Sequence, residues 1–467
     1  MDVSIPLAAE LTQARTLMAF TLGFHIILAC LGVGFPTIML VANYLGLRRN
    51  DPVALGLAKR WSKVAAVTFA VGAVTGTVLS FEFGLLWPEF TGRFGGVFGV
   101  LFAVEGIFFF LEAIFIAIYI FGWKRLSGWA HFWTGVPIAV CGIGGAFSVV
   151  AVNAWMNQPQ GYTLDSAGKV TDVDPLKVIF NPAVPYEVPH MIFAAYIVAG
   201  FLIASVYAVG MLRGRRDRHH RLGMLIPLTI AAIATPIQFG IGDTAARAIA
   251  DDQPVKFAAM ACVQETSTDV TEYLGGRCTS DGVKGGIGIP GLDSFLVGWS
   301  TSTEVTGLDS VPPDDRPPAN TLLHWSFDAM VGICTLLMGL GAWLGISWLR
   351  RRDFPKSRWF LRATALSGAA AIVALECGWI VTEVGRQPWV VYEVMRTEDA
   401  VTGASGVSIT LAAVILLYTV LGAATVIILR AMARRWRTEE IADEDVPYGP
   451  RASLPEAGAA ASPEGSS

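Results

Sequence analysis

Residues 97–122 read VFGVLFAVEGIFFFLEAIFIAIYIFG, and this stretch decides the class of fold. Its only charged side chains are those of Glu105 and Glu112. An apolar run of at least about 18 residues is long enough to cross a bilayer as a helix. Because the run is continuous rather than alternating, it favours a membrane helix over a barrel strand. The sequence therefore predicts an all-α membrane protein.

The rest of the chain has the same character. Of its 467 residues, 53% are hydrophobic and 15% are charged, and the mean hydropathy is +0.53. Soluble domains carry about 25% charged residues. The net charge of −4 gives no indication of a nucleic-acid partner. The first sixteen residues lack the basic segment and cleavage site of a signal peptide, so we expect the first span to direct insertion.

Continuous apolar runs predict nine membrane-spanning helices. Arg and Lys cluster after the first, third, fifth, seventh and ninth runs, whereas the other connections are mixed or acidic. By the positive-inside rule the basic loops are cytoplasmic, which places the N-terminus outside and the C-terminus inside. The expected spans are 17–46, 64–87, 97–122, 132–155, 189–212, 223–244, 321–349, 360–383 and 406–431.

The spans and loops divide the chain into four parts. Residues 1–244 carry the first six spans and residues 321–437 the last three. Between them, residues 245–320 form an outer loop that is too polar to enter lipid and too long to be only a connector, so we expect it to be functional. The Pro-, Ala-, Gly- and Ser-rich composition of residues 438–467 predicts a disordered cytoplasmic tail.

Two of the six cysteines, Cys262 and Cys278, fall in the outer loop. That compartment is oxidising, which favours a disulfide between them. Closing a loop of this length would stabilise it by about 3 kcal/mol. Two unrelated thiols are the alternative. The other four cysteines lie in apolar spans and are expected to be buried thiols.

Ionisable residues inside a span are costly, so each is a candidate for function. His25 lies within the first span without a polar neighbour in sequence. A hydrogen bond to another helix would explain it, and so would a role as an axial haem ligand. His190 opens the fifth span, where small residues on the next turn leave room for a flat macrocycle. Met330, about nine residues into the seventh span, is a candidate axial partner, although Met is often only core filler.

Glu105 and Glu112 are seven residues apart and share one helix face, with a rise of about 10 Å between them. Two carboxylates on one face in hydrocarbon resist ionising together, which suits a proton relay, or a ligand and a relay. Hydrogen bonds that join helices are the other explanation.

Glu383, Arg386 and Trp389 lie at the outer end of the eighth span. An ion pair at the membrane boundary is the simplest explanation for the first two. Independent structural residues would scatter in depth, however, and a shared depth favours bound cofactors. The predicted topology places four other candidates in the same outer half: His25, Glu105, His190 and Met330.

Six motifs together resemble the large subunit, subunit I, of cytochrome bd-type quinol oxidases. They cover nearly all of the membrane region, and GRQPW after a Glu is the most specific of them. The motifs are FEFGLLWPEFTGRFGGVFG (81–99), EGIFFFLEAIF (105–115), FGWKRL (121–126) followed by His131, NAWMNQPQGY (153–162), QPVKFAAM (253–260) and GWIVTEVGRQPW (378–389).

The resemblance implies a haem-bearing subunit of a terminal oxidase. Such an enzyme oxidises ubiquinol or menaquinol at the outer face and reduces O₂ to water with cytoplasmic protons. It generates proton motive force without pumping. A partner subunit II, a small accessory subunit in some members and a bacterial cytoplasmic membrane are also implied.

The resemblance also implies haem ligands, residue by residue. His190 and Met330 match the axial pair of a low-spin haem b. His25 matches a ligand of one of two high-spin haems and Glu383 a ligand of the other. These two are a haem b and either a haem d or a further haem b. Arg386, in one motif with Trp389, matches the residue that holds haem propionates.

Further residues match positions of proton and quinol chemistry in the family. Glu105 matches an acidic group beside the high-spin pair, and Glu112 matches a relay position toward the cytoplasm. His131 occupies a position with a structural or proton-linked role. Lys256 matches the quinol-binding Lys of the outer loop, which is called the Q-loop in this family.

Three features depart from the common pattern of the family. Ala261 stands where a Glu is frequent, and Glu265 lies four residues further on as a candidate substitute in quinol binding. Asp328 stands where many members have an Arg. The Q-loop is also of the short kind. These departures suggest the cyanide-insensitive branch.

Two other functions are compatible with the residues taken alone. A quinone-linked haem protein that does not reduce O₂ would need only paired axial ligands, and the unpaired candidates His25 and Glu383 argue against it. A proton-coupled transporter would use the intramembrane glutamates, but the expected internal repeats are missing.

Overall fold

The structure is a computed structural model and describes residues 4–318, 320–404 and 406–438. Within these ranges it contains nine helices that are long and apolar enough to cross a membrane. The prediction of an all-α polytopic protein is thereby confirmed. The predicted tail lies outside the described residues, apart from residue 438.

Each predicted span corresponds to one long helix. The nine are α1 (Ser4–Arg49), α2 (Pro52–Leu86), α3 (Pro88–Gly122), α4 (Gly128–Asn157), α6 (Val184–Leu212), α7 (Arg218–Asp252), α10 (Asn320–Arg351), α11 (Arg358–Gly385) and α12 (Val407–Thr438).

Short elements occupy the connections. The helical ones are α5 (Pro175–Ile179), α8 (Pro254–Ala261), α9 (Leu292–Gly298), η1 (Leu308–Ser310) and η2 (Pro313–Asp315). The strands are β1 (Thr163–Leu164), β2 (Val170–Thr171), β3 (Glu272–Leu274), β4 (Arg277–Thr279), β5 (Gly282–Lys284), β6 (Ile287–Ile289), β7 (Trp389–Val391) and β8 (Met395–Arg396).

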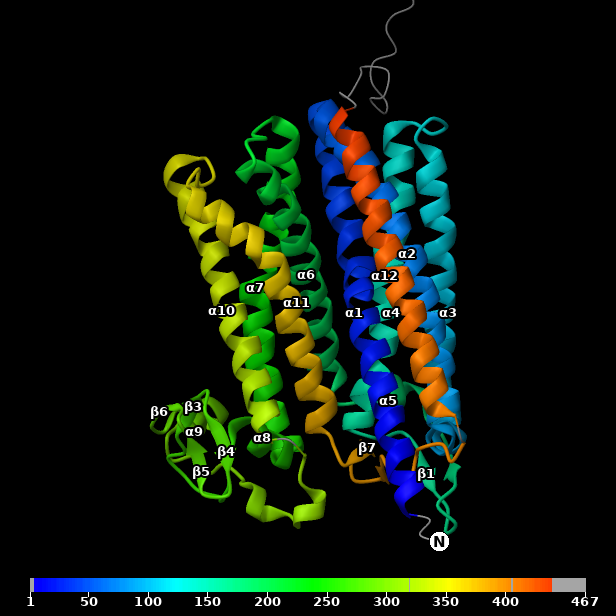
Figure 1. Cartoon of the computed structure of the whole chain (residues 1–467), viewed down its shortest axis with the longest axis vertical. Helices are drawn as coiled ribbons and strands as arrows, with labels where there is room; N and C mark the ends of the chain where they lie inside the picture. Colours follow the sequence, from blue (N-terminus) through cyan, green and yellow to red (C-terminus); the bar gives the residue numbers. More distant parts are fainter. Residues whose placement is uncertain (1–3, 319, 405, 439–467) are drawn as a thin grey trace, which may run out of the picture.

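The long helices form two groups that lie side by side (Figure 1). One group contains α6, α7, α10 and α11, and α6 and α10 each pack against both α7 and α11. The other contains α1 to α4 and α12. The groups are joined where α6 packs against α1 and α4.

Small residues allow α6 and α7 to approach closely. A Cβ atom on Gly200 would come within 2.7 Å of both the Cβ atom of Ala231 and the carbonyl oxygen of Pro227. Atoms this close cannot be accommodated without moving one helix, so glycine at position 200 sets the spacing between α6 and α7. This contact fixes the position of α6, the helix that carries His190, relative to α7.

The two ends of the bundle differ. The end that carries residues 158–183, 253–318 and 386–404, here called the loop-rich end, also holds the start of α1 (Figure 1). Short basic turns join the helices at the opposite end, here called the basic end. There Asp51 caps α2 by accepting hydrogen bonds from Val53 N and Ala54 N, and it also binds Arg218 of α7 at 2.5 Å.

Several helices are longer than their apolar runs. α1 begins at Ser4 instead of near residue 17, and α7 continues to Asp252 instead of ending near residue 244. In α7 the polar extension is stabilised because Arg247 binds Asp243 one turn earlier, at 3.0 Å, and lies over the ring of Trp299 at 4.1 Å. Hydropathy locates the segment in lipid, whereas side-chain contacts decide where the helix ends.

The loop from residue 253 to α10 is folded. β3 pairs antiparallel with β6, and β4 pairs antiparallel with β5. Cys262 and Cys278 form a disulfide, with Cα atoms 5.6 Å apart, that joins the end of α8 to β4. Buried apolar side chains of α8, including Phe257 and Met260, pack against Leu323 of α10 and Val381 of α11. The loop is thereby anchored on two helices of the first group.

Candidate functional site

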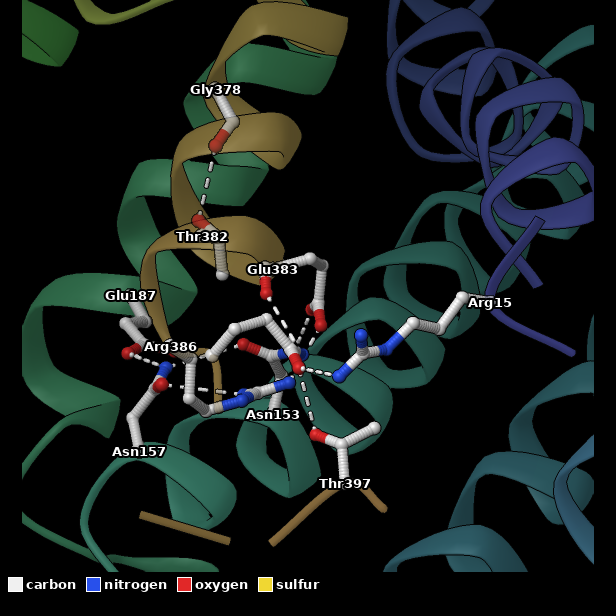
Figure 2. A network of polar contacts seen from close by, with 10 residues as sticks. Arg15, Asn153, Asn157, Glu187, Gly378, Thr382, Glu383, Arg386 and Thr397 are labelled. Atoms are coloured by element: carbon white, nitrogen blue, oxygen red, sulfur yellow. Dashed lines mark hydrogen bonds and ion pairs between the residues drawn. The ribbon is translucent and has the colours of Figure 1, made fainter. Parts of the chain in front are cut away.

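Glu383 lies in the last turn of α11, and Arg386 follows directly after the helix (Figure 2). Glu383 Oε2 accepts a hydrogen bond from Arg386 Nη2 at 2.6 Å, and Oε1 accepts one from Asn153 Nδ2 of α4 at 2.7 Å. Arg386 is 3% exposed, whereas a third of the Glu383 side chain is exposed. The carboxylate is therefore held in a fixed position with one side open.

The network continues across three helices through Asn157, one turn further along α4. Asn157 Oδ1 accepts a hydrogen bond from Arg386 Nη1 at 3.3 Å, and Asn157 Nδ2 donates one to Glu187 Oε1 of α6 at 2.7 Å. Figure 2 shows Glu187, Asn157, Arg386 and Glu383 facing one another. Sequence reasoning identified Glu383 and Arg386 but missed these two amides and Glu187.

Gln387 extends the same network toward α1. Its Oε1 accepts hydrogen bonds from Arg15 Nη2 at 2.7 Å and from Thr397 Oγ1 at 2.9 Å. Trp389, two residues further on, begins β7, where the guanidinium of Arg396 lies 5.1 Å from the centre of its ring. These contacts fix the segment that follows Arg386.

His190 and Met330 lie on α6 and α10, which both pack against α7 and α11. The two side chains thus come from helices on opposite sides of one four-helix group. A glycine on a neighbouring helix adjoins each of them. A Cβ atom on Gly242 of α7 would come within 3.5 Å of His190 Cε1, and one on Gly378 of α11 within 3.0 Å of Met330 Sδ.

His25 lies on α1 in the other helix group. Its Nδ1 is 2.9 Å from Thr75 Oγ1 of α2, and the Thr75 carbonyl accepts a hydrogen bond from the Tyr418 hydroxyl of α12. A Cβ atom on Gly76 would lie 3.0 Å from His25 Cε1. A hydrogen bond that holds one imidazole nitrogen orients the ring and leaves the other nitrogen for a ligand.

Lys256 is buried on α8, with 3% exposure, and its aliphatic stem lies against Gly385 at the end of α11. Burial lowers the pKa of Lys256 to about 8, and the carboxylate of Glu187 opposes this shift. Glu265, the other expected quinol-binding residue, is exposed beyond the disulfide. Ala261 is buried at the end of α8.

A second acidic cluster lies in the folded loop. Glu272 of β3 and Asp293 of α9 are both buried and share a hydrogen bond. Burial, reinforced by Asp293, raises the pKa of Glu272 to about 10. Asp328 of α10, which stands where many members of the family have an Arg, accepts a hydrogen bond from Gly275 N at 2.5 Å. An acid at position 328 therefore caps the loop backbone, which an Arg could not do because it has no acceptor atom.

Glu112 lies deeper in the bundle, on α3, and is 8% exposed. It lines a cavity of about 10 Å³ together with Ser62, Thr68 and Tyr119, and such a volume holds about one water molecule. Glu105, two turns away on the same helix, is half-buried. The two glutamates share a face, as expected from their spacing.

His131 lies in the first turn of α4, the helix that begins at the basic end of the bundle (Figure 1). It is fully buried, its Nε2 is 2.6 Å from the Tyr119 carbonyl oxygen, and its ring stacks on that of Tyr119 at 4.1 Å. In this position it joins α3 to α4.

Two further glutamates within the spans, the buried Glu82 and the half-buried Glu376, were missed at the level of the sequence. Glu82 of α2 accepts a hydrogen bond from Thr21 Oγ1 of α1 at 2.6 Å. Glu376 of α11, two turns before Glu383, approaches α1 so that a Cβ atom on Gly23 would lie 3.2 Å from its Oε2. Both lie in apolar runs, so the rule that singled out Glu105 and Glu112 would have found them.

Comparison with known proteins gives a consistent result. Residues 13–436 match the family model described as cytochrome bd terminal oxidase subunit I. A putative cytochrome bd menaquinol oxidase subunit I of Bacillus subtilis (strain 168) is 34% identical over 440 residues, which is 92% of this chain and 98% of the relative. Subunit 1 of the cytochrome bd-II ubiquinol oxidase of Escherichia coli (strain K12) is 24% identical, covering 90% and 96% of the two chains.

A solved structure agrees with these relatives. The structure of bd oxidase from Geobacillus thermodenitrificans superposes with a TM-score of 0.86 at 35% sequence identity, and the match covers 91% of this chain and 98% of that chain. Both the sequence and the helix arrangement are therefore shared over nearly the whole length. The chain belongs to the cytochrome bd terminal oxidase subunit I family.

Proposed function

We propose that this chain is the haem-bearing subunit of a quinol:O₂ oxidoreductase. It oxidises a quinol at the loop-rich end and reduces O₂ to water with protons taken from the basic end. The loop-rich end faces outside and the basic end faces the cytoplasm, so the reaction builds proton motive force without pumping. The observation that carries the proposal is the Glu383 carboxylate, fixed by Arg386 and Asn153 with one side open, in a chain of this family.

The residues fit haem groups. His190 and Met330 would hold a low-spin haem b, and the glycines beside them leave space where side chains would otherwise stand. Buried His190 Nδ1 has no hydrogen-bond partner among the described residues, and Arg386 Nε is likewise a buried donor without an acceptor. A free guanidinium donor suits a propionate.

His25 and Glu383 would each hold one of two high-spin haems, one a haem b and the other a haem d or a further haem b. When bound, these groups supply one-electron transfer and, where the protein gives a single ligand, a free coordination position for O₂. The chain itself supplies orientation, through Thr75 at His25 and Asn153 at Glu383.

The buried polar groups away from the haem ligands would serve substrate and protons. Lys256 would bind a quinol oxygen, and Glu265 would contribute from the surface of the loop. Glu112 and Glu105 would carry protons from the basic end, and the cavity beside Glu112 has room for one water molecule on that path. His131 would keep α3 and α4 together near the entrance.

The relatives suggest the substrate class, the partners and the compartment. They are named for menaquinol in one case and ubiquinol in others, so we propose a quinol of one of these kinds. We also propose a complex with subunit II, with a small accessory subunit as a further component, in the cytoplasmic membrane of a bacterium.

An optical experiment tests this proposal. Reduced-minus-oxidised spectra of the purified complex, with and without CO, are recorded for the wild type and for Glu383→Ala. We expect low-spin haem bands in both and a lost or altered CO signal in the variant. A far-red chlorin band in the wild type would identify haem d, and its absence would favour haem b at the oxygen site.

The exposed Glu398→Ala is the matched control, because it removes a carboxylate from the same end of the molecule. Its spectra should equal those of the wild type. A well-folded wild type without haem bands would refute the proposed function. A CO signal that Glu383→Ala leaves unchanged would remove Glu383 from the iron.

A further inference from the structure

A carboxylate that sequence reasoning did not single out interacts with the charge of Lys256. Glu187 lies on α6, one turn before His190, and is half-buried. Its Oε1 is held by Asn157 Nδ2 at 2.7 Å, whereas its Oε2 makes no hydrogen bond with any described residue. One oxygen thus fixes the side chain and the other is free to accept a proton.

Lys256 gives this carboxylate a chemical context. The lysine is almost fully buried, and its ammonium makes no hydrogen bond with the described part of the chain. The charged groups that face it are Glu187, Arg386 and Glu383. A buried cation needs a counter-charge, and α8, with the sequence PVKFAAMA, has no carboxylate of its own.

The charges around Glu187 come from Lys256, Arg386 and Glu383. Lys256 faces it from α8, Glu383 from the last turn of α11 and Arg386 from the position directly after α11. Together they form a group of two cations and two anions. Arg386 is already engaged with Glu383, through the bond between Nη2 and Oε2 at 2.6 Å. Glu187 and Lys256 therefore remain as the acceptor and donor available to a ligand.

We propose that Glu187 is the base that accepts the proton of a quinol hydroxyl bound beside Lys256. This proposal rests on the quinol oxidase function proposed above and deepens it. The O–H bond of the quinol breaks, its electron pair stays on the oxygen, and the proton forms a carboxylic acid on Glu187. Lys256 stabilises the resulting negative oxygen by charge and hydrogen bonding.

The geometry explains why Glu187 suits this step better than Glu383. Both oxygens of Glu383 already accept hydrogen bonds, from Asn153 and from Arg386. Glu265 is exposed, so water and salt would screen its charge, and it would not act on a substrate that is buried. Glu187 alone among these three combines partial burial with a free oxygen and a place next to Lys256.

The test compares two electron donors in the purified complex. One is a quinol analogue, which must lose protons when oxidised. The other is tetramethyl-p-phenylenediamine, a one-electron donor with no N–H or O–H proton to lose. The variant Glu187→Gln keeps an oxygen for Asn157 but removes the base. Removal of a general base costs about 10²–10⁴-fold.

We expect Glu187→Gln to lower kcat with quinol by about 10²-fold or more while KM changes little. Oxidation of tetramethyl-p-phenylenediamine and the dithionite-reduced haem spectrum should stay as in the wild type. The rise of quinol oxidation with pH, which follows loss of the proton from the base, should also disappear. Glu304→Gln is the matched control: it removes an exposed carboxylate from the folded loop that carries Lys256, and it should behave as the wild type.

Glu187→Asp provides a second test if Glu187→Gln assembles poorly. It keeps a carboxylate but moves it back by one methylene group, so quinol oxidation should fall while the other donor is oxidised normally. An unchanged kcat with quinol in either variant would overturn the proposal. Equal loss with both donors at normal haem content would also overturn it, because the defect would then lie in electron transfer. A wild type that oxidises neither donor would refute the proposed function itself.

Discussion

Removal of the Cys262–Cys278 disulfide should loosen the folded loop without unfolding the helix bundle. The bond closes a segment with a sequence separation of 16 and joins the end of α8 to β4. Loop-closure entropy for a segment of this length corresponds to about 3 kcal/mol. That free energy changes the equilibrium between closed and open loop by roughly 10²-fold.

The remaining contacts determine where the effect appears. α8 keeps its apolar packing against Leu323 and Val381, and His324 Nδ1 still binds the Met260 carbonyl at 2.9 Å. The strand pairs β3–β6 and β4–β5 have only short ladders of three residues each. We therefore expect the strands to open much more often, while α8 changes little.

Hydrogen–deuterium exchange on the purified complex measures this difference. In the double variant Cys262→Ser/Cys278→Ser, amides of residues 272–289 should exchange about 10²-fold faster, provided that exchange occurs from the open state. Cys141→Ala, which removes a buried free thiol of α4, is the control and should leave the loop unchanged. Equal protection of the strands in the double variant and the wild type would refute the entropic argument.

Three further predictions concern the loop and the helix frame. Burial raises the pKa of Glu272 to about 10 from its usual value near 4.5, so its neutral form stabilises the folded loop fully below about pH 4.5, and this contribution is lost as the pH rises toward 10. Proteolysis of the loop in the wild type should therefore become faster between pH 6 and pH 10, and Glu272→Gln should remove the part of this increase that comes from ionisation of Glu272. An unchanged pH dependence in the variant would contradict this. Gly200→Ala should destabilise the complex by about 1–3 kcal/mol, because its Cβ would meet the Pro227 carbonyl; thermal unfolding should show a lower Tm than for Gly145→Ala, whose Cβ has open space. Asp51→Ala should cost about 1–2 kcal/mol through loss of the α2 cap, and a Tm equal to that of the wild type would show that the cap contributes nothing.

The sequence predicted the helices well because a membrane imposes one strong rule on them. Each of the nine apolar runs corresponds to one long helix of the described residues. The helix ends were less accurate, as α7 shows: its last turns are polar and are held by Arg247, which binds Asp243 and stacks on Trp299. Trp299 lies in a different element, so the contact is not visible in a local sequence window.

The candidate site was only partly predictable for a similar reason. Glu383 and Arg386 are three residues apart, and their ion pair follows from helical spacing. Asn153 and Asn157 are uncharged and lie in a different span, so no rule about ionisable groups singles them out. Glu187 lies at the border of its span, where a carboxylate is common, and only the fold places it near Lys256.

The hydrogen bond between Asn153 and Glu383 also sets an order of events during synthesis. The two residues are 230 positions apart, and translation proceeds at about 5–20 residues per second, so Asn153 emerges from the ribosome roughly 10–50 s before its partner. During that interval the fifth, sixth and seventh membrane helices (α6, α7 and α10) are made, while Asn153 still lacks its hydrogen-bond partner on α11. The hydrogen-bonded network at Glu383 is complete only when the eighth long helix has been inserted. If Glu383 holds a haem as proposed above, loading of that haem is therefore a late step in biogenesis, and a chain truncated before α11 would pass through the membrane-insertion machinery without ever forming this site.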